Sequence, residues 1–65
     1  MKDEAKELPD VQMLTIAEVA DYLRLSRQKV YTMAKTGAIP AVTFGRAVRI
    51  PRAKFIKWLE ERDAS

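Results

Sequence analysis

The sequence predicts a single small α+β domain, in which two short helices joined by a tight turn are followed by a β-hairpin and a C-terminal helix. Two helix-capping residues, Thr15 and Ser26, each precede a stretch of apolar side chains with helical spacing. Apolar residues then alternate on both sides of Gly45-Arg46, which is typical of a hairpin. After Pro51 the apolar residues return to helical spacing.

The composition excludes several classes of protein and site. The chain has 65 residues, enough for one domain with a small core. It contains no cysteine and no histidine, so disulfides, thiolate and imidazole metal sites and the commonest general base are absent. We therefore expect no enzymatic activity, no catalytic residue, no metal site and no cofactor.

Membrane and secretory signals are also missing from the sequence. No apolar run approaches the roughly 18 residues of a transmembrane helix, and no signal-peptide core follows Met1-Lys2. We expect a cytoplasmic protein that does not bind membranes. Residues 1–12 have mixed charge, no periodic apolar pattern and a proline at Pro9, so they are predicted to form a flexible N-terminal tail. Residues 13–65 form the predicted folded domain.

The first helix is predicted over residues 16–23. Thr15 and Glu18 form a capping-box pattern, in which each side chain bonds the backbone N–H of the other residue. The second helix is predicted from an N-cap at Ser26 to about Thr36, because Gly37 suits the left-handed conformation that ends helices.

The two helices together match the apolar pattern of a helix-turn-helix unit. A small residue, Ala20, stands where two helices crossing at a steep angle must approach closely. Arg24 occupies the turn position that glycine often holds, so the turn is strained or has another geometry. The apolar positions of the pattern are filled by Val19, Leu23, Leu25, Val30 and Met33.

The hairpin has two candidate registers. A two-residue Gly45-Arg46 loop suits a type II′ turn, but it pairs Phe44 with Ala47 and puts Val48 on the opposite face. A three-residue loop pairs Phe44 with Val48 and unites all the apolar residues of the hairpin. We favour the second register, because burial usually fixes register. Thr43 and Arg49 then point outward, and Arg46 lies at the tip.

The last helix is predicted to open at Pro51, where the missing N–H costs no hydrogen bond, and to fray after Arg62. Phe55, Trp58 and Leu59 form its apolar stripe and are predicted to lie in the core.

The charge distribution indicates a polyanionic partner. The net charge is +3, yet residues 24–57 contain nine lysines or arginines and no acidic residue. On the second helix Val30, Met33 and Ala34 share one side and are predicted to face the core. The opposite side can contact base edges and phosphates. It consists of Arg27, Gln28, Tyr31, Thr32 and Lys35.

Other residues on or near that helix and on the hairpin have alternative roles. Ser26 and the helix N-terminus can offer N–H groups to a phosphate, and Lys29 at the edge contacts phosphate or nothing. The charged residues can equally form an ordinary solvated surface, and Tyr31 can cover the hairpin instead of contacting nucleic acid. Arg46 and Arg49 are either gatekeepers of an edge strand or wing contacts with DNA, and we favour the second.

With these landmarks, the sequence resembles the small excisionase and AlpA-type DNA-binding proteins, whose fold is similar to the DNA-binding domain of MerR regulators. The resemblance covers about residues 13–62. It rests on Leu14-Thr15, Glu18-Val19-Ala20, Ser26 with Val30-Tyr31, Gly37 with Ile39-Pro40, residues 49–52 and Trp58-Leu59. One departure is Ala53-Lys54, where many relatives carry serine followed by an acid, so a cap of the last helix is lost.

The resemblance implies a winged helix-turn-helix, with the second helix in the major groove and the hairpin as a wing against the adjacent minor groove or backbone. It implies a bacterial, nucleoid-associated protein that binds duplex DNA sequence-selectively. Its role would be that of an excisionase of a mobile element, binding clustered sites beside copies of itself and bending DNA for a recombinase (integrase). An AlpA-type transcriptional regulator is the alternative, and a protein-interaction module for a recombinase or an acidic partner is a more distant one. Because no heptad helix follows the domain, we expect a monomer in free solution.

Overall fold

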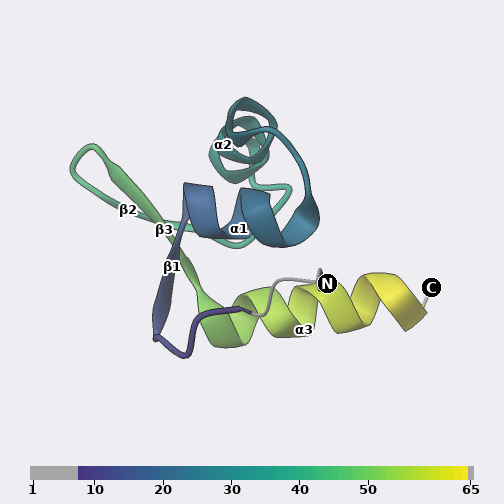
Figure 1. Cartoon of the computed structure of the whole chain (residues 1–65). Coiled ribbons are helices and arrows are strands. Elements are labelled where there is room, and N and C mark those ends of the chain that lie inside the picture. The colour runs from purple at the N-terminus through teal and green to yellow at the C-terminus, as the bar shows by residue number, and fades with distance from the viewer. Residues whose placement is uncertain (1–7, 65) are drawn as a thin grey trace, which may run out of the picture.

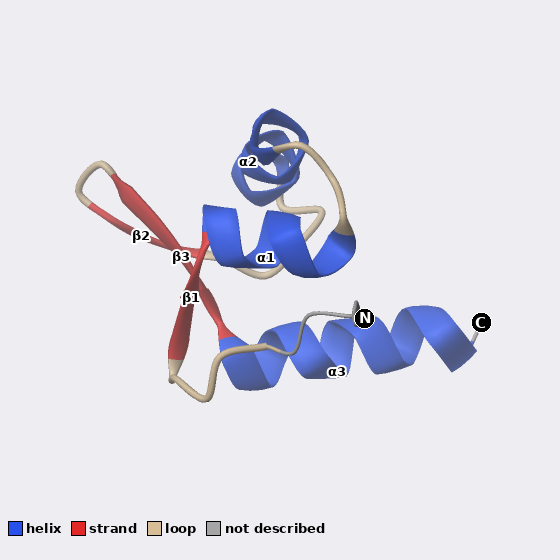
Figure 2. Cartoon of the chain, viewed as in Figure 1, coloured by secondary structure: helices blue, strands red, loops and turns tan. Residues whose placement is uncertain are grey.

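The computed structural model describes residues 8–64 of the chain (Figure 1). Three helices lie to one side of a three-stranded antiparallel sheet with the strand order β1-β3-β2 (Figure 2). The predicted α+β winged helix-turn-helix is therefore confirmed. In chain order the elements are β1 (Met13–Thr15), α1 (Ile16–Leu23), α2 (Arg27–Thr36), β2 (Val42–Phe44), β3 (Ala47–Pro51) and α3 (Arg52–Ala64).

The first helix begins at the predicted capping box. The Glu18 backbone N–H donates to Thr15 Oγ1 at 3.1 Å, and the Thr15 backbone N–H donates to Glu18 Oε1 at 2.9 Å. Two N–H groups that a helix start leaves without partners are thereby satisfied. The capping box fixes the predicted start of α1 at Ile16.

The turn between α1 and α2 is closed by Arg24 in the left-handed conformation, with φ 61° and ψ 41°. This is the conformation for which glycine is preferred, and the Leu25 N–H then donates to the Ala20 carbonyl at 3.0 Å. The same turn directs Leu25 outward, where its side chain is 38% exposed. Leu25 therefore fills an apolar position of the helix-turn-helix pattern without being buried.

The second helix has the predicted caps. The Lys29 backbone N–H donates to Ser26 Oγ at 3.1 Å, and Gly37 ends the helix with φ 85°. Val30 is fully buried, while Met33 and Ala34 pack at the edge of the core, so α2 presents its predicted apolar side to the domain.

The short strand β1 was not predicted. It pairs with β3 so that Leu14 lies opposite Ile50 and Thr15 opposite Arg49. Three residues that run directly into a helix cap are too few to show an alternating pattern. Its presence makes β3 the central strand of the sheet.

The hairpin adopts the register that we did not favour. Phe44 pairs with Ala47 and Thr43 with Val48 across a two-residue Gly45-Arg46 loop, and Gly45 has φ 60°. Because opposite residues share a face, Thr43 lies on the face of Val48, contrary to prediction, and Phe44 lies on the other face. The hairpin projects beyond the helices (Figure 1), so burial does not act on Phe44 and the turn geometry sets the register.

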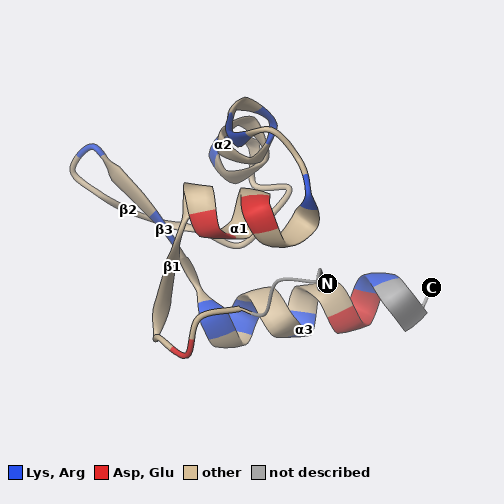
Figure 3. Cartoon of the chain, in the orientation of Figure 1, with Lys and Arg blue, Asp and Glu red and all other residues tan. Residues whose placement is uncertain are grey.

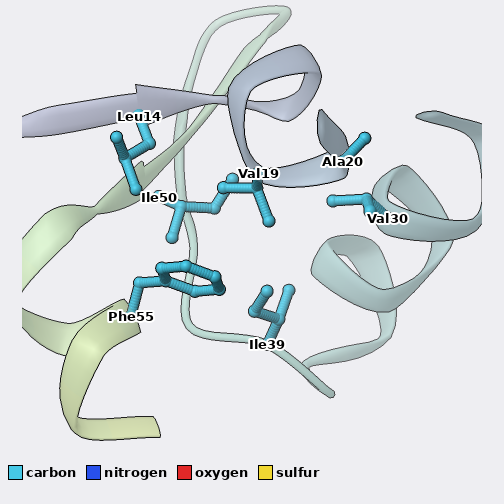
Figure 4. Packing of buried hydrophobic residues seen from close by; sticks show 7 residues of the cluster. All are labelled: Leu14, Val19, Ala20, Val30, Ile39, Ile50 and Phe55. Carbon is cyan, nitrogen blue, oxygen red and sulfur yellow. The ribbon is translucent and has the colours of Figure 1, made fainter. Parts of the chain in front are cut away.

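The core lies between the sheet and the three helices (Figure 4). Ile39, in the loop after α2, is a core residue that the sequence analysis missed. The buried cluster consists of Leu14, Val19, Ala20, Val30, Ile39, Ile50 and Phe55.

Trp58 is only half-buried, although it was predicted to lie in the core. Its ring stacks on Phe55 with 5.8 Å between the centroids, and its indole N–H donates to the Ala38 carbonyl at 2.9 Å. The indole therefore joins α3 to the loop after α2. Pro51, predicted to open the last helix, instead ends β3, and α3 continues past the predicted fraying point at Arg62.

Part of the predicted tail contacts the domain. Arg52 Nε donates to the Pro9 carbonyl at 3.0 Å, and the Arg52 backbone N–H donates to the Gln12 carbonyl at 2.9 Å. Leu8 packs against the core. These contacts were not anticipated, and residues 1–7 of the predicted tail lie outside the described part of the chain.

We expect Arg24→Gly to stabilise the domain by about 1 kcal/mol, because glycine adopts the left-handed conformation without the Cβ penalty. For a domain of this size, that corresponds to a rise in Tm of roughly 4–8 °C. Arg24→Ala is the matched control, since it removes the charge but keeps the backbone penalty. Equal melting temperatures for the two variants would contradict a strained turn.

We expect Phe55→Ala to destabilise the domain by about 3–5 kcal/mol, because the ring is fully buried. Trp58→Ala removes a half-buried ring and is expected to cost less, and Trp58→Phe to cost about 1 kcal/mol for the lost hydrogen bond. Urea unfolding followed by circular dichroism measures all three. If Trp58→Ala lowered the free energy of unfolding as much as Phe55→Ala, the half-buried indole would contribute as much to stability as the fully buried ring, contrary to this expectation.

Candidate nucleic-acid interface

The exposed side of α2 carries every site residue predicted on that helix. Val30, on the core-facing side, is fully buried, and the first turn of the helix contains no acidic residue. The exposed side chains are those of Ser26, Arg27, Gln28, Lys29, Tyr31, Thr32 and Lys35, of which Ser26 is the N-cap.

The start of α2 offers backbone donors at the same surface. Ser26 Oγ accepts the Lys29 N–H, so the cap residue is already engaged within the protein. Helix geometry leaves the amides of Arg27 and Gln28 without an intrahelical acceptor. The positive end of the helix dipole adds to the charge of Arg27 and Lys29 at this position.

Tyr31 lies beside Lys35 on the exposed side. The Lys35 Nζ is 5.9 Å from the centroid of the Tyr31 ring, and the tyrosine is 44% exposed. This exposure favours the prediction that Tyr31 is available to a ligand over the alternative in which it covers the hairpin.

The two predicted wing residues differ in their surroundings. Arg46 is exposed in the turn at the end of the hairpin, and this end projects away from the body (Figure 3). Arg49 is half-buried, and its Nη1 donates to the Val48 carbonyl at 2.9 Å. Because Arg49 belongs to the central strand β3, it does not guard a sheet edge, whereas that role stays open for Arg46 beside the edge strand β2.

The continuous basic stretch of the sequence divides into separate surfaces in the fold. One group lies on α2 and another on the hairpin, whereas Arg52, Lys54 and Lys57 lie on α3, across α1 from α2 (Figure 3). Acidic Glu18 and Asp21 belong to the intervening α1. The sequence alone does not predict this separation, because a count along the chain does not distinguish the faces of different helices.

Phe44 is a candidate functional residue that the sequence analysis assigned to the core. It is 56% exposed, close to Arg46 in the turn. The signal was present in the sequence: the Gly45-Arg46 pair, read as a type II′ turn, places Phe44 on the face opposite Val48.

Other kinds of site find little support within residues 8–64. These residues contain no group of three or more acidic side chains that could hold a metal ion. None of the polar or charged side chains of residues 8–62 is buried. No helix in this part of the chain has the length and apolarity needed to cross a membrane.

Several curated proteins are similar to this chain. A protein of Saccharopolyspora erythraea named "Probable excisionase" is 44% identical over 48 residues, which cover 74% of this chain and 49% of that protein. Proteins from two strains of Mycobacterium tuberculosis, each named "Putative DNA-binding protein", are 46% identical over 39 residues, or 60% of this chain and 50% of each protein. The chain thus spans about half the length of the curated relatives it matches. No solved structure matches it significantly.

The family comparison agrees with the geometry. The model of a family described as a helix-turn-helix domain matches residues 13–63, which include every element from β1 to nearly the end of α3. This match and the similarity to the "Probable excisionase" confirm the resemblance to small excisionase-type proteins. Because the match spans most of the chain, including the α1 and α2 pair joined at Arg24, the chain belongs to the helix-turn-helix domain family.

Proposed function

We propose that this domain binds duplex DNA sequence-selectively, with α2 in the major groove and the hairpin against the adjacent minor groove or backbone. The observation that carries the proposal is the exposed side of α2, which is basic and polar, free of acidic residues and backed by buried Val30. The similar proteins named as DNA-binding and as an excisionase support it.

The side chains of α2 have the chemistry that groove recognition needs. Arg27 can donate two hydrogen bonds to a guanine edge, and Gln28 can both donate to and accept from an adenine. Tyr31 and Thr32 can donate to phosphate or touch a thymine methyl group, while Lys29 and Lys35 contribute mainly charge. On the hairpin, Arg46 and Arg49 would fix the position of the domain.

The first test is an NMR titration of backbone amides with a mixed-sequence duplex at low and moderate salt. We expect salt-sensitive shifts concentrated in residues 26–35 and 44–49, because phosphate contacts release counterions. Shifts confined to α3, or no shifts at low salt, would contradict the proposed interface. Such a result would favour a protein-interaction module instead.

Two sets of variants separate base recognition from positioning. Arg27→Ala or Gln28→Ala should weaken binding to a selected site by roughly 1–3 kcal/mol and reduce the preference over random DNA. Arg46→Ala should weaken binding to all sequences about equally and lower the slope of log K against log salt by about 0.9. Fluorescence anisotropy with selected and random duplexes measures both. The same loss of preference in all three variants would contradict the division of roles.

We further propose an architectural role in excision of a mobile element. One small module typically buries only about 600–1,000 Å² of its own surface on DNA, so several copies at clustered sites are expected to act together and bend the duplex for a recombinase. The name of the Saccharopolyspora protein supports this role over transcriptional regulation.

We expect a monomer in free solution and assembly of copies only on DNA. Sedimentation at tens of micromolar protein tests the first part, and binding to duplexes with one or two selected sites tests the second. A stable dimer without DNA, or identical affinity per site on both duplexes, would contradict this model.

A further inference from the structure

Phe44 occupies an unusual position for a large apolar side chain. It immediately precedes the Gly45-Arg46 turn, and its partner across the hairpin is the small residue Ala47. At 56%, it is the most exposed large hydrophobic residue of the described part of the chain. The core residues of β3, Val48 and Ile50, face the other side of the sheet, so the ring contributes little to the packing of the domain.

The surroundings of Phe44 are cationic. Arg46 is in the adjoining turn, Arg49 shares the same face of the sheet, and no acidic residue occurs anywhere between residues 24 and 57. An exposed apolar ring beside two arginines fits a polyanion that also offers apolar surface. Duplex DNA has this combination, because sugars and base faces lie between its phosphates.

The shape of the hairpin suits the minor groove. The two-stranded ribbon projects from the body and ends in its turn (Figure 1), and Phe44 lies directly beside this turn. Proteins that enter the minor groove frequently insert an apolar side chain between base pairs, which unstacks one step and kinks the duplex.

We propose that Phe44 inserts into the minor groove and partly separates one base step, while Arg46 contacts a neighbouring phosphate. This inference rests on the proposed DNA binding and deepens it. It supplies a physical source for bending by a single copy. It also implies a preference for easily deformed steps, TA or CA/TG, beneath the wing.

The test uses a duplex with one selected site that carries 2-aminopurine, a base whose fluorescence rises on unstacking, at successive positions along one strand. Binding is measured by anisotropy of a second label on the full-length chain. The variants are Phe44→Ala, Phe44→Leu and Arg46→Ala, with Val11→Ala as the matched control. Val11 is also an exposed apolar residue, at 46%, but it lies in the loop before β1.

We expect the wild-type protein to raise 2-aminopurine fluorescence at only one labelled position of the selected site, the step beneath the wing. Phe44→Ala should abolish this rise and weaken binding about fivefold to a hundredfold, the range found when an aromatic ring stacked on a base is removed. Its salt slope should stay unchanged, since no phosphate contact is lost. Phe44→Leu should keep part of the signal, and Val11→Ala should behave as wild type.

Arg46→Ala should show the complementary pattern, with a salt slope lower by about 0.9 and the fluorescence signal retained. Because Phe44 is exposed, Phe44→Ala should also melt at the wild-type temperature, which circular dichroism verifies.

Two results would overturn the inference while leaving DNA binding intact. In one, Phe44→Ala binds and unstacks DNA as well as wild type. In the other, it loses only the cooperativity between two adjacent sites, which would assign Phe44 to contact with a second copy. Failure of the wild-type protein to bind any duplex at low salt would instead refute the proposed function itself.

Discussion

The positions of the other elements depend on the alternation of side chains along β3. Val48 and Ile50 point into the core, and Ala47, Arg49 and Pro51 point away from it. The same five residues hold β1 on one edge and β2 on the other, and they lead directly into α3. A shift of β3 by one residue would expose Ile50 and bury Arg49, so every neighbouring element is constrained by one register.

The two parts of the proposed DNA surface, α2 and the outer end of the hairpin, are held in place differently. The helix α2 is held through α1 and the contact of Val30 with the core, independently of the outer end of the hairpin. The hairpin projects beyond the helices (Figure 1), and residues 42–46 at its outer end are exposed. The roles proposed for the two parts, base recognition for α2 and positioning for the hairpin, agree with this difference, because a segment with few packed contacts opens locally at low cost.

Local patterns in the sequence predicted the helices, their caps and the fold class. The capping box at Thr15, the cap at Ser26 and the stop at Gly37 depend on neighbouring residues, and the structure confirms all three. The errors arose where the outcome depends on contacts distant in sequence. Phe44 was placed in the core because an apolar residue was assumed to be buried, yet the core does not extend that far. The strand β1 and the buried position of Ile39 depend on partners that no local pattern identifies.

The predicted side of α2 is exposed, as expected. That the lysines of α3 lie on a different surface could be recognised only from the folded structure. Sequence periodicity gives the faces of one helix, but the mutual orientation of two helices follows from packing.

The hydrogen bonds of Arg52 to the segment before β1 have a practical consequence. They hold residues 8–12 against the start of α3. The first described residues therefore lie beside the last helix. Both ends of the described chain therefore lie on the α3 side, across α1 from α2 (Figure 1). A fluorophore, an affinity tag or a second domain can be joined at either end without crossing the exposed side of α2. The domain is accordingly suited to tethering, with its proposed contact surface left clear.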